Sequence, residues 1–537
     1  MRRLRVGLTA LLLIGGGPAG ARPDDARVLA DHLERVFAER YAPAALKERT
    51  LGWRLPEQMQ FLRKHLAASR SGAETRVAFR RFFRSLRDLH TSIAPADTRT
   101  VWLGVQLAST NRGVRVAWVE PSLHLPLQVG DEVTALDGLP IGRARAGIAE
   151  GCGYRSTPDS ERAFADWFLT LRSSGDLDRV PQAGTSTRLK VRGHGTIALP
   201  WLEFNGDTAC PFWPKAKRSV LPEPPSVEWR APESATWQAY AFTSAGRHYG
   251  FIRLHTYDLP PDRQRQALVD FDAAIDAFHS AEGLIIDQRG NAGGNFLLAD
   301  AMLSRLGPLV PTPQRFLVRG AEVVGFGDKE ELGTLSATLA APRSDEGARA
   351  AMDAIPLFAN AFSFGPRDLA TALSSADFFG FFAGQSDGLT TPHAELIDHF
   401  RARGPLFTGR VVMLIDGLAL SAGDFAPATL QDAGRATLFG TTTAGAGGDQ
   451  RHVGLNDECG TRPSLLSVCA PRSVLDGLRR LGFSGYSYTV TLGVRPGGRV
   501  IENRGVTPDV RYDLTLADLQ SGFAPMRAKL LETLERG

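Results

Sequence analysis

The sequence is short of several features that would assign it to a protein class at once. Its 62 basic residues nearly balance its 58 acidic ones, which excludes a nucleic-acid binder defined by bulk positive charge. No segment beyond the N-terminus has the roughly 20 uninterrupted apolar residues of a membrane-spanning helix. With 43% hydrophobic and 22% charged residues, a largely disordered or fibrous chain is also excluded. The 537 residues therefore predict a globular protein of about two to four domains.

Cysteine and lysine are both scarce. The four cysteines fit an oxidising compartment. Proximity in the sequence favours pairing Cys459 with Cys469 and Cys152 with Cys210, although four cysteines allow three connectivities. Seven of the basic residues are lysine, and none lies between positions 330 and 528. That stretch therefore contains no amine that could act as a catalytic base.

The N-terminus has the three parts of an export signal. Arg2, Arg3 and Arg5 make a positively charged start. The apolar stretch from Val6 to Ile14 follows, and Ala19-Gly20-Ala21 is a small-residue cleavage pattern. We expect this signal peptide to be removed after its 21 residues. The mature protein should then be periplasmic or extracellular in a bacterium, without a membrane span.

Hydrophobic spacing divides the rest of the chain into domains. Apolar residues at helical spacing predict a helical N-terminal domain over 22–99, and short strands with turn dipeptides predict a β-rich domain over 100–203. The proline-rich stretch 204–236 predicts a linker. Strands then alternate with helices over 237–537, with a mixed insertion at about 308–404, which predicts a layered α/β core. The expected fold class is multidomain α+β.

The β-rich domain resembles a bacterial PDZ domain. The resemblance lies in the loop Leu103-Gly104-Val105, in Gly130–Val133 and in the turn dipeptide Asp137-Gly138. PDZ domains bind an extended peptide, often by its C-terminal carboxylate, at the edge of a sheet. The resemblance implies that Leu103, Gly104 and Val105 form the peptide-binding loop. A β-rich domain without a peptide partner is the alternative.

Three later segments have features of a catalytic site. The glycine-rich turn Asp287–Gly294 follows a buried strand, and its backbone N–H groups can face an oxyanion. Ser421 follows a second buried strand, 411–416, near the start of a helix, a place that exposes a hydroxyl to helix N–H groups. A serine that only caps the helix is the alternative. The turn-rich run Val500–Asp509 has no interpretation by itself.

Together these segments resemble the C-terminal processing peptidases, or tail-specific proteases, which share a core with the tricorn protease. The matching motifs occur in the family's order at Asp287–Gly294, Ser421–Asp424, Leu430–Asp432 and Gly505–Asp509. The resemblance implies a ClpP/crotonase-like peptidase core with Ser421 as the nucleophile. It also implies that Asp432 supports the structure and that Asp287 and Arg289 hold the turn.

The general base is implied by one branch of the family. Relatives with a Ser–Lys site carry a lysine 25 residues after the serine, where this chain has Ala446. The tricorn-like branch instead uses a histidine, often in a Leu-x-Asp-x-His-Thr run that here is Leu86–Thr91. The resemblance implies His90 as the base and Glu502 as a residue that orients the site. The tricorn protease has a serine where Leu89 lies here. None of the seven lysines is then expected to affect the rate.

The resemblance also implies the stabilising groups and the reaction. Backbone N–H groups of Ala422 and of Gly293 or Gly294 should hold the oxyanion. The predicted function is an exported serine endopeptidase that forms an acyl-enzyme, with no metal, cofactor or nucleic-acid partner. Its substrates would be polypeptides, with recognition at their C-termini as one option.

Two other functions stay open. A catalytically inactive relative that binds peptides or small apolar ligands fits the missing lysine. An esterase fits Ala419–Gly423, which is one residue from a Gly-x-Ser-x-Gly elbow, but that fold needs a late histidine and only His452 follows Ser421. Labelling by a fluorophosphonate distinguishes an active serine from an inactive one.

Overall fold

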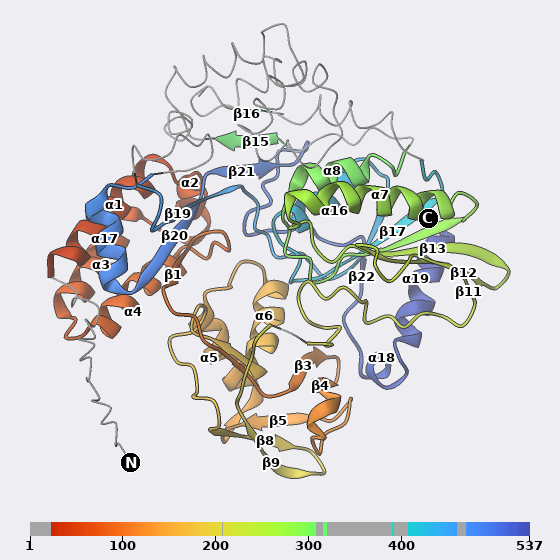
Figure 1. Ribbon diagram of the computed structural model, residues 1–537, viewed down its shortest axis with the longest axis horizontal. Coiled ribbons are helices and arrows are strands. Elements are labelled where there is room, and N and C mark those ends of the chain that lie inside the picture. The colour runs from red at the N-terminus through yellow and green to blue at the C-terminus, as the bar shows by residue number, and fades with distance from the viewer. Residues whose placement is uncertain are drawn as a thin grey trace, which may run out of the picture.

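The computed structural model describes residues 23–206, 208–307, 315–318, 389–390, 406–458 and 469–536. Figure 1 shows three lobes: a helical lobe that contains the N-terminal helices, a β-rich lobe, and an α/β lobe that ends in the C-terminal helix. The expected signal peptide, nearly all of the insertion and Cys459 lie outside the described residues.

The helical lobe is built from both ends of the chain (Figure 1). Its elements are α1 (Pro23–Glu39), α2 (Ala44–Leu51), α3 (Leu55–Ala68), α4 (Gly72–Ser85), β1 (Ser92–Pro95), β19 (Gln450–Gly454), α17 (Arg472–Leu481) and β20 (Phe483–Thr489). The strands form an antiparallel sheet in the order β1–β20–β19. Phe37 and Phe82 share one buried core with Leu478 and Tyr488. The N-terminal helices therefore bury their apolar faces against the C-terminal part of the chain.

The β-rich lobe has the elements of a PDZ domain. They are β2 (Thr100–Trp102), β3 (Val105–Thr110), β4 (Gly113–Val119), η1 (Pro121–Leu123), β5 (Val133–Leu136), β6 (Leu139–Pro140), α5 (Ile141–Cys152), α6 (Pro158–Thr170), β7 (Leu171–Ser173), β8 (Ser186–Val191), β9 (Gly195–Pro200) and β10 (Leu202–Glu203). Asp137 and Gly138 both have positive φ, 49° and 83°, and join β5 to β6 in a tight turn. β8 alternates exposed and buried residues, as a strand with one solvated face does.

The α/β lobe has a seven-stranded sheet in the order β11–β12–β13–β14–β17–β18–β22. The strands are β11 (Val227–Arg230), β12 (Gln238–Ser244), β13 (Arg247–Arg253), β14 (Gly283–Asp287), β17 (Arg410–Ile415), β18 (Thr437–Gly440) and β22 (Val510–Arg511). From β13 to β22 every pairing is parallel, whereas β11 and β12 pair antiparallel. The parallel strands therefore end at one edge, where the loops after β14 and β17 meet.

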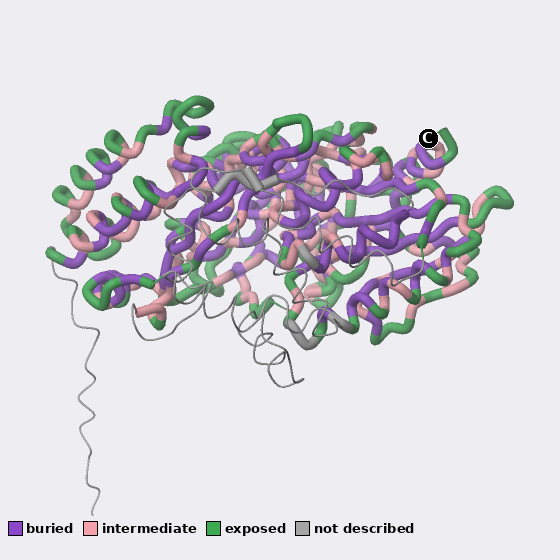
Figure 2. The backbone as a smooth tube through the Cα atoms, turned by 90° about the horizontal axis from the view of Figure 1, so that it is seen from above, coloured by how far each residue is buried: buried purple, intermediate pink, exposed green. Residues whose placement is uncertain are grey.

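Helices cover both faces of this sheet. One face packs against α7 (Pro261–Ala277), α8 (Phe296–Leu303) and α16 (Ala422–Asp432), and the other against α18 (Leu516–Gln520) and α19 (Ala524–Arg536). Alternate residues of β14 divide between the two cores, with Ile286 on the first and Ile285 on the second. All five residues of β14 are buried, as expected for a central parallel strand. In Figure 2 buried backbone fills the interior of the molecule, and exposed segments lie around its rim.

Two described pieces of the expected insertion extend a second sheet. They are β15 (Arg315–Val318) and β16 (Leu389–Thr390), and they form a sheet with β21 (Thr491–Val494) in the order β16–β15–β21. These two short strands therefore lie beside β21, which comes just before the Val500–Asp509 motif.

The expected pairing of Cys152 with Cys210 is wrong, because both are free and buried. Cys152 ends α5 and packs in the core of the β-rich lobe, whereas Cys210 lies in the proline-rich stretch beside Trp213. Burial raises the pKa of Cys152 to about 11, so this thiol stays protonated. Cys469 is disulfide-bonded, and its expected partner is outside the described residues.

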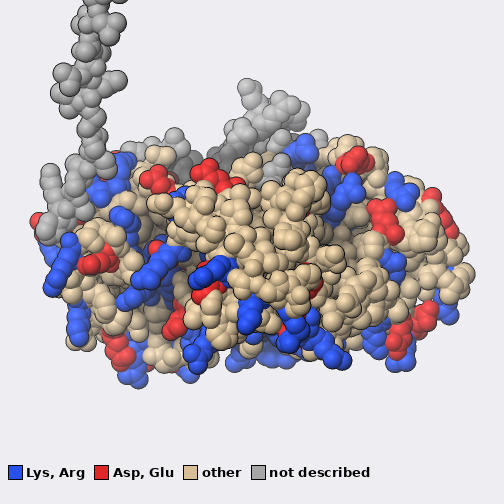
Figure 3. Space-filling view, turned by 90° about the horizontal axis from the view of Figure 1, so that it is seen from below, with Lys and Arg blue, Asp and Glu red and all other residues tan. Residues whose placement is uncertain are grey.

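The surface fits the balanced composition. On the face shown in Figure 3, basic and acidic side chains are interspersed. Among the helices of the described ranges, none is both long and apolar enough to cross a bilayer.

Candidate active site

A buried charge network holds the glycine-rich turn after β14. The Arg289 guanidinium donates to both carboxylate oxygens of Asp287 at 2.9 Å, and the Ser219 hydroxyl donates to Oδ2 at 2.5 Å. The Arg253 guanidinium lies 3.4 Å from Oδ1. Although burial opposes ionisation, Arg289 and Arg253 hold the pKa of Asp287 well below its usual value. Asp287 and Arg289 thus have the turn-holding contacts expected of them.

Ser421 lies in a sharp turn between β17 and α16. Its backbone has φ 59° and ψ −123°, a conformation that is rare for a residue with a side chain. Ala422, the next residue, is the first of α16. A strand, a strained turn and a helix start are the arrangement that presents a nucleophilic serine in other hydrolase folds.

The glycine-rich turn and the Ser421 turn are joined directly. Three hydrogen bonds connect them, from Leu420 N–H to the Asn291 carbonyl (3.1 Å), from Gln288 Nε2 to the Gly423 carbonyl (2.8 Å) and from Gly290 N–H to Asp416 Oδ1 (2.9 Å). A Cβ atom on Gly293 would lie 2.6 Å from both the Leu420 oxygen and the Ser421 Cβ. Only glycine therefore allows the turn to pack against the serine.

Asp424 ties Ser421 to the loop that follows β18. Its Oδ2 accepts the N–H groups of Ser421 at 3.0 Å and of Ala446 at 2.9 Å. Its Oδ1 accepts the Gly445 N–H at 2.8 Å and the Thr443 hydroxyl. Burial raises the pKa of Asp424 to about 6, although these hydrogen bonds favour the carboxylate. Ala446 thus contributes its backbone to the support of the serine.

Two of the three expected oxyanion donors are available. Within the described ranges, the backbone N–H groups of Ala422 and Gly294 have no acceptor in the protein. The Gly293 N–H instead donates to Asn291 Oδ1 at 2.9 Å. This hydrogen bond closes the turn and counts against Gly293 as an oxyanion donor.

His90 is buried in the loop between α4 and β1, with 5% of its surface exposed. Its backbone N–H donates to Asp88 Oδ1 at 2.9 Å, and its backbone carbonyl accepts from the Ser487 hydroxyl at 2.8 Å. Its Nδ1 has no hydrogen-bond partner among the described residues. Burial lowers the pKa of His90, although the charges of Asp88 and Asp449 act to raise it. The imidazole is therefore neutral at neutral pH, which is the form that accepts a proton.

Glu502 is buried as well, with 1% of its surface exposed. Its Oε2 accepts the Gly447 N–H at 3.0 Å, and its Oε1 accepts a hydrogen bond from the Lys47 ammonium. Burial raises the pKa of Glu502 to about 7 although Lys47 favours the carboxylate, and Asp88 adds to the rise.

One short segment, 443–449, lies among the groups around the three expected catalytic residues. Thr443, Gly445 and Ala446 donate to Asp424, which in turn accepts the Ser421 N–H. The Gly447 N–H donates to Glu502, and the charge of Asp449 favours the protonated form of His90. No hydrogen bond joins His90 to the Ser421 hydroxyl in the part of the chain that the structure describes. Catalytic hydrogen bonds are often formed only when substrate is bound.

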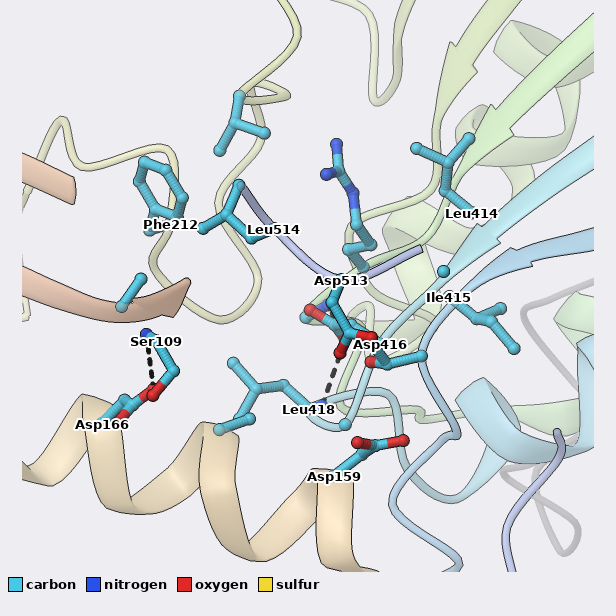
Figure 4. Close-up of a pocket in the computed structure, with 18 of the residues that line it drawn as sticks. Ser109, Asp159, Asp166, Phe212, Leu414, Ile415, Asp416, Leu418, Asp513 and Leu514 are labelled. Atoms are coloured by element: carbon cyan, nitrogen blue, oxygen red, sulfur yellow. Dashed lines mark hydrogen bonds between the residues drawn. The ribbon is translucent and has the colours of Figure 1, made fainter. Parts of the chain in front are cut away.

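The expected peptide-binding edge of the β-rich lobe is occupied by side chains. β3 pairs with β4 on one side, and on its free edge the Ser109 N–H donates to Asp166 Oδ2 of α6 at 2.8 Å (Figure 4). Gln106 Nε2 donates to the Leu107 carbonyl at 2.8 Å. Leu123 covers the loop, because a Cβ atom on Gly104 would lie 2.2 Å from its Cδ1. Leu103 and Val105 are buried in the lobe's own core.

A cavity of about 210 Å³ lies between this edge and the α/β lobe. It opens beyond the Ser109–Asp166 contact, and Phe212, Leu418 and Leu514 line it in Figure 4. Leu418 belongs to the loop that leads to Ser421. The cavity therefore connects the β-rich lobe with the strand ends that carry the candidate site.

Family comparison identifies the core. Residues 248–512 match the model of peptidase family S41, and residues 99–207 match a PDZ domain model. The α/β core of the chain therefore belongs to peptidase family S41, and its β-rich lobe is a PDZ domain. Family S41 consists of serine peptidases, which are hydrolases. The expected peptidase relationship is thus confirmed at the level of family S41. The assignment to the C-terminal processing peptidases and to their tricorn-like branch stays a prediction.

Similar proteins span most of this S41 chain. A protein of Chlamydia pneumoniae is 26% identical and covers 91% of this chain and 86% of its own. An uncharacterised protein of Chlamydia muridarum is 24% identical, with 91% and 88% covered. The crystal structure of mature CPAF matches with a TM-score of 0.75 at 22% identity, covering 96% of this chain and 98% of that one. A second structure of mature CPAF, complexed with lactacystin, has a TM-score of 0.74. CPAF thus shares the fold of this chain.

Sequence reasoning missed three residues that surround the site. Asp88 lies in the same run as His90 and could have been proposed from that motif. Asp424 lies in the serine motif, but its contacts with the 443–446 loop have no local signal. Lys47 has no signal at all, because its partner Glu502 is 455 residues away.

Proposed function

We propose that this S41 protein is a serine endopeptidase in which Ser421 attacks the carbonyl carbon of a peptide bond. The observation that supports this most is the strained Ser421 turn at the start of α16, packed against the glycine-rich turn. A serine that only caps a helix does not require positive φ. The strain is consistent with a residue held for chemistry.

His90 serves as the general base in this proposal. As the Ser421 oxygen bonds to the carbonyl carbon, its proton passes to His90. The same proton then goes to the leaving amine when the C–N bond breaks. A water molecule then attacks the acyl-enzyme and gives a proton to His90. His90 passes this proton to the Ser421 oxygen as its bond to the acyl carbon breaks, which releases the carboxylic acid and restores both residues. The low pKa of the buried imidazole supports this role, because the base starts neutral.

The developing charges need two further groups. N–H groups of Ala422 and Gly294 would hold the oxyanion, which is supported by their lack of other acceptors within the described ranges. The Glu502 carboxylate would orient His90 and stabilise its imidazolium. A Ser–Lys mechanism has no support at position 446, because alanine has no amine.

The proposal also covers location and substrate. The N-terminal signal supports export, and a mature N-terminus at Arg22, measured by mass spectrometry, would test it. The substrates would be polypeptides, and the PDZ domain supports peptide binding near the site.

Labelling with a fluorescent fluorophosphonate tests the nucleophile. The probe should form a Ser421 Oγ–P bond with loss of fluoride, and the Ser421→Ala variant should remain unlabelled and fail to hydrolyse labelled casein. Ser71→Ala is the matched control, because Ser71 caps α4 by accepting the Glu74 N–H at 3.3 Å. That control should lose about 1 kcal/mol of stability and keep full labelling.

The inactive-relative alternative makes the opposite prediction. A folded wild-type protein that neither reacts with the probe nor cleaves casein between pH 5 and pH 9 would refute the peptidase proposal. Equal labelling of wild type and Ser421→Ala would remove Ser421 from the mechanism.

A further inference from the structure

Lys47 is a charged side chain with no exposed surface. It belongs to α2 in the helical lobe, far in sequence from the serine and histidine motifs. A lysine is seldom buried completely unless its charge is paired, because removing an ammonium from water is costly. Its surroundings must therefore compensate the charge.

Three oxygen atoms surround the Lys47 nitrogen. It donates to Glu502 Oε1, to Asn503 Oδ1 at 2.5 Å and to the Arg87 carbonyl at 3.4 Å. Three acceptors use all three N–H bonds of an ammonium, so the nitrogen has no lone pair with which to take a proton. Lys47 therefore fits the role of a fixed cation and does not fit that of a general base.

We propose that Lys47 is a positioning residue that keeps the Glu502 carboxylate ionised and in place beside the 447–449 segment. The inference rests on the proposed function, in which that carboxylate orients His90. It also revises the expectation that no lysine affects the rate.

Other charges around this pair make the ammonium necessary. Asp88 is a second buried carboxylate, which accepts from the Tyr41 hydroxyl at 2.8 Å and from the Thr489 hydroxyl. Although burial opposes ionisation, Lys47 lowers the pKa of Asp88. His90 and Asp449 are the remaining titratable groups that act in this cluster. Without the cation, two buried carboxylates that repel each other would have no positive charge to compensate them, and one of them would take up a proton.

The pH dependence of fluorophosphonate labelling tests the inference. In Lys47→Met, which keeps the length of the side chain but not its charge, the acid limb of the labelling rate should move to higher pH by roughly 1–3 units. Lys47→Arg should keep most of the wild-type limb, because it keeps the charge. In a Glu502→Gln background, Lys47→Met should cause no further displacement. Lys529→Met is the matched control, since Lys529 pairs with Glu532 at 3.0 Å on the surface of α19, and it should leave the profile unchanged.

A second measurement does not depend on activity. A carboxyl group whose pKa is higher in the folded than in the unfolded state makes the protein less stable as pH rises between the two values. The loss of stability caused by ionising Glu502 should be complete near pH 7 in the wild type. In Lys47→Met the stability should continue to fall above pH 7. The gap in urea midpoint between the two proteins should therefore widen from pH 6 to pH 9, and Glu502→Gln should abolish the widening.

The two measurements separate the inference from the function on which it rests. If the wild type does not react with the probe, the peptidase proposal fails, and the widening gap in urea midpoint still decides whether Lys47 holds the Glu502 charge. The inference would be overturned if Lys47→Met lowered the labelling rate equally at every pH, with its acid limb at the wild-type pH, and if the difference in urea midpoint from the wild type stayed constant with pH. Lys47 would then only fill space.

Discussion

Ser421 is packed against a residue that has no side chain. The Cα of Gly293 is so close to the serine turn that a Cβ atom would come within 2.6 Å of Ser421 Cβ and 2.8 Å of the Ala422 nitrogen. Gly293 also has φ 83°, which glycine adopts without strain. The nucleophile candidate Ser421 and the candidate oxyanion donor Ala422 are therefore both packed directly against the glycine-rich turn.

We expect Gly293→Ala to push the glycine-rich turn and the Ser421 turn apart. Overpacking and the positive φ together should lower the free energy of unfolding by about 2–4 kcal/mol, and fluorophosphonate labelling should fall because the Ala422 and Gly294 N–H groups move. Urea denaturation and labelling rates measure the two effects. Gly434→Ala is the control, since Gly434 also has positive φ, next to the other end of α16, but in open space. It should cost only about 1 kcal/mol and leave labelling intact. Wild-type labelling of Gly293→Ala would contradict the assigned geometry.

The free edge of β3 competes with any peptide that would add to the PDZ sheet. Asp166 accepts the Ser109 N–H, and its other oxygen lies 3.6 Å from the Arg145 guanidinium without a hydrogen bond. Burial raises the pKa of Asp166, although Ser109 and Arg145 favour its carboxylate. A peptide must displace this side chain before it can pair with the edge.

Asp166→Ala should therefore strengthen peptide binding. The released Ser109 N–H is worth about 1 kcal/mol as a hydrogen bond, which corresponds to roughly a fivefold lower Kd. Fluorescence anisotropy with a labelled peptide that has a free, apolar C-terminus measures this change. Glu161→Ala is the control on the same helix, where Glu161 pairs with Arg155 instead of β3. Weaker binding by Asp166→Ala would mean that the carboxylate itself holds the peptide.

The β-rich lobe and the α/β lobe are held together at the start of α6. Asp159 accepts from Arg511 at 2.7 Å and 2.9 Å and from the Thr442 N–H at 2.9 Å, so that α6 is tied to the ends of β18 and β22. A Cβ atom on Gly417 would lie 2.4 Å from the Asp159 carbonyl oxygen. The PDZ lobe is therefore packed against the loop that leads to Ser421.

This contact should depend on acid pH. Although burial opposes ionisation, the Arg511 guanidinium lowers the pKa of Asp159 to about 2, below its usual value of 3.8. A lowered pKa stabilises the folded state above pH 4, and the effect disappears as pH falls toward 2. Asp159→Asn should thus be less stable by roughly 2 kcal/mol at pH 6 and nearly equal to the wild type at pH 2. Urea denaturation across this range measures the difference, and half-exposed Asp513 supplies the control variant Asp513→Asn. A difference that is constant with pH would contradict the role of the ionised carboxylate.

Local motifs in the sequence determine much of this protein by themselves. The buried strand, glycine turn and helix start depend on residues that are neighbours in sequence, and the structure has these elements at β14, β17 and α16. Ser421 and the turn Asp287–Gly294 could be proposed together for that reason. The motifs also predicted a peptidase core and a PDZ domain, and family S41 and a PDZ domain model match those parts of the chain.

Only the tertiary structure decided how distant parts combine. The core of the helical lobe contains residues from the N-terminal helices and from the C-terminal part of the chain. Cys152 and Cys210 are both free, although pairing Cys459 with Cys469 would leave these two for each other. Lys47 meets Glu502 across 455 residues. Such contacts depend on how amphipathic faces pack, and many arrangements satisfy the same local periodicity. The sequence could therefore name the nucleophile candidate, whereas the pairing of Lys47 with Glu502 became visible only once the lobes were packed together.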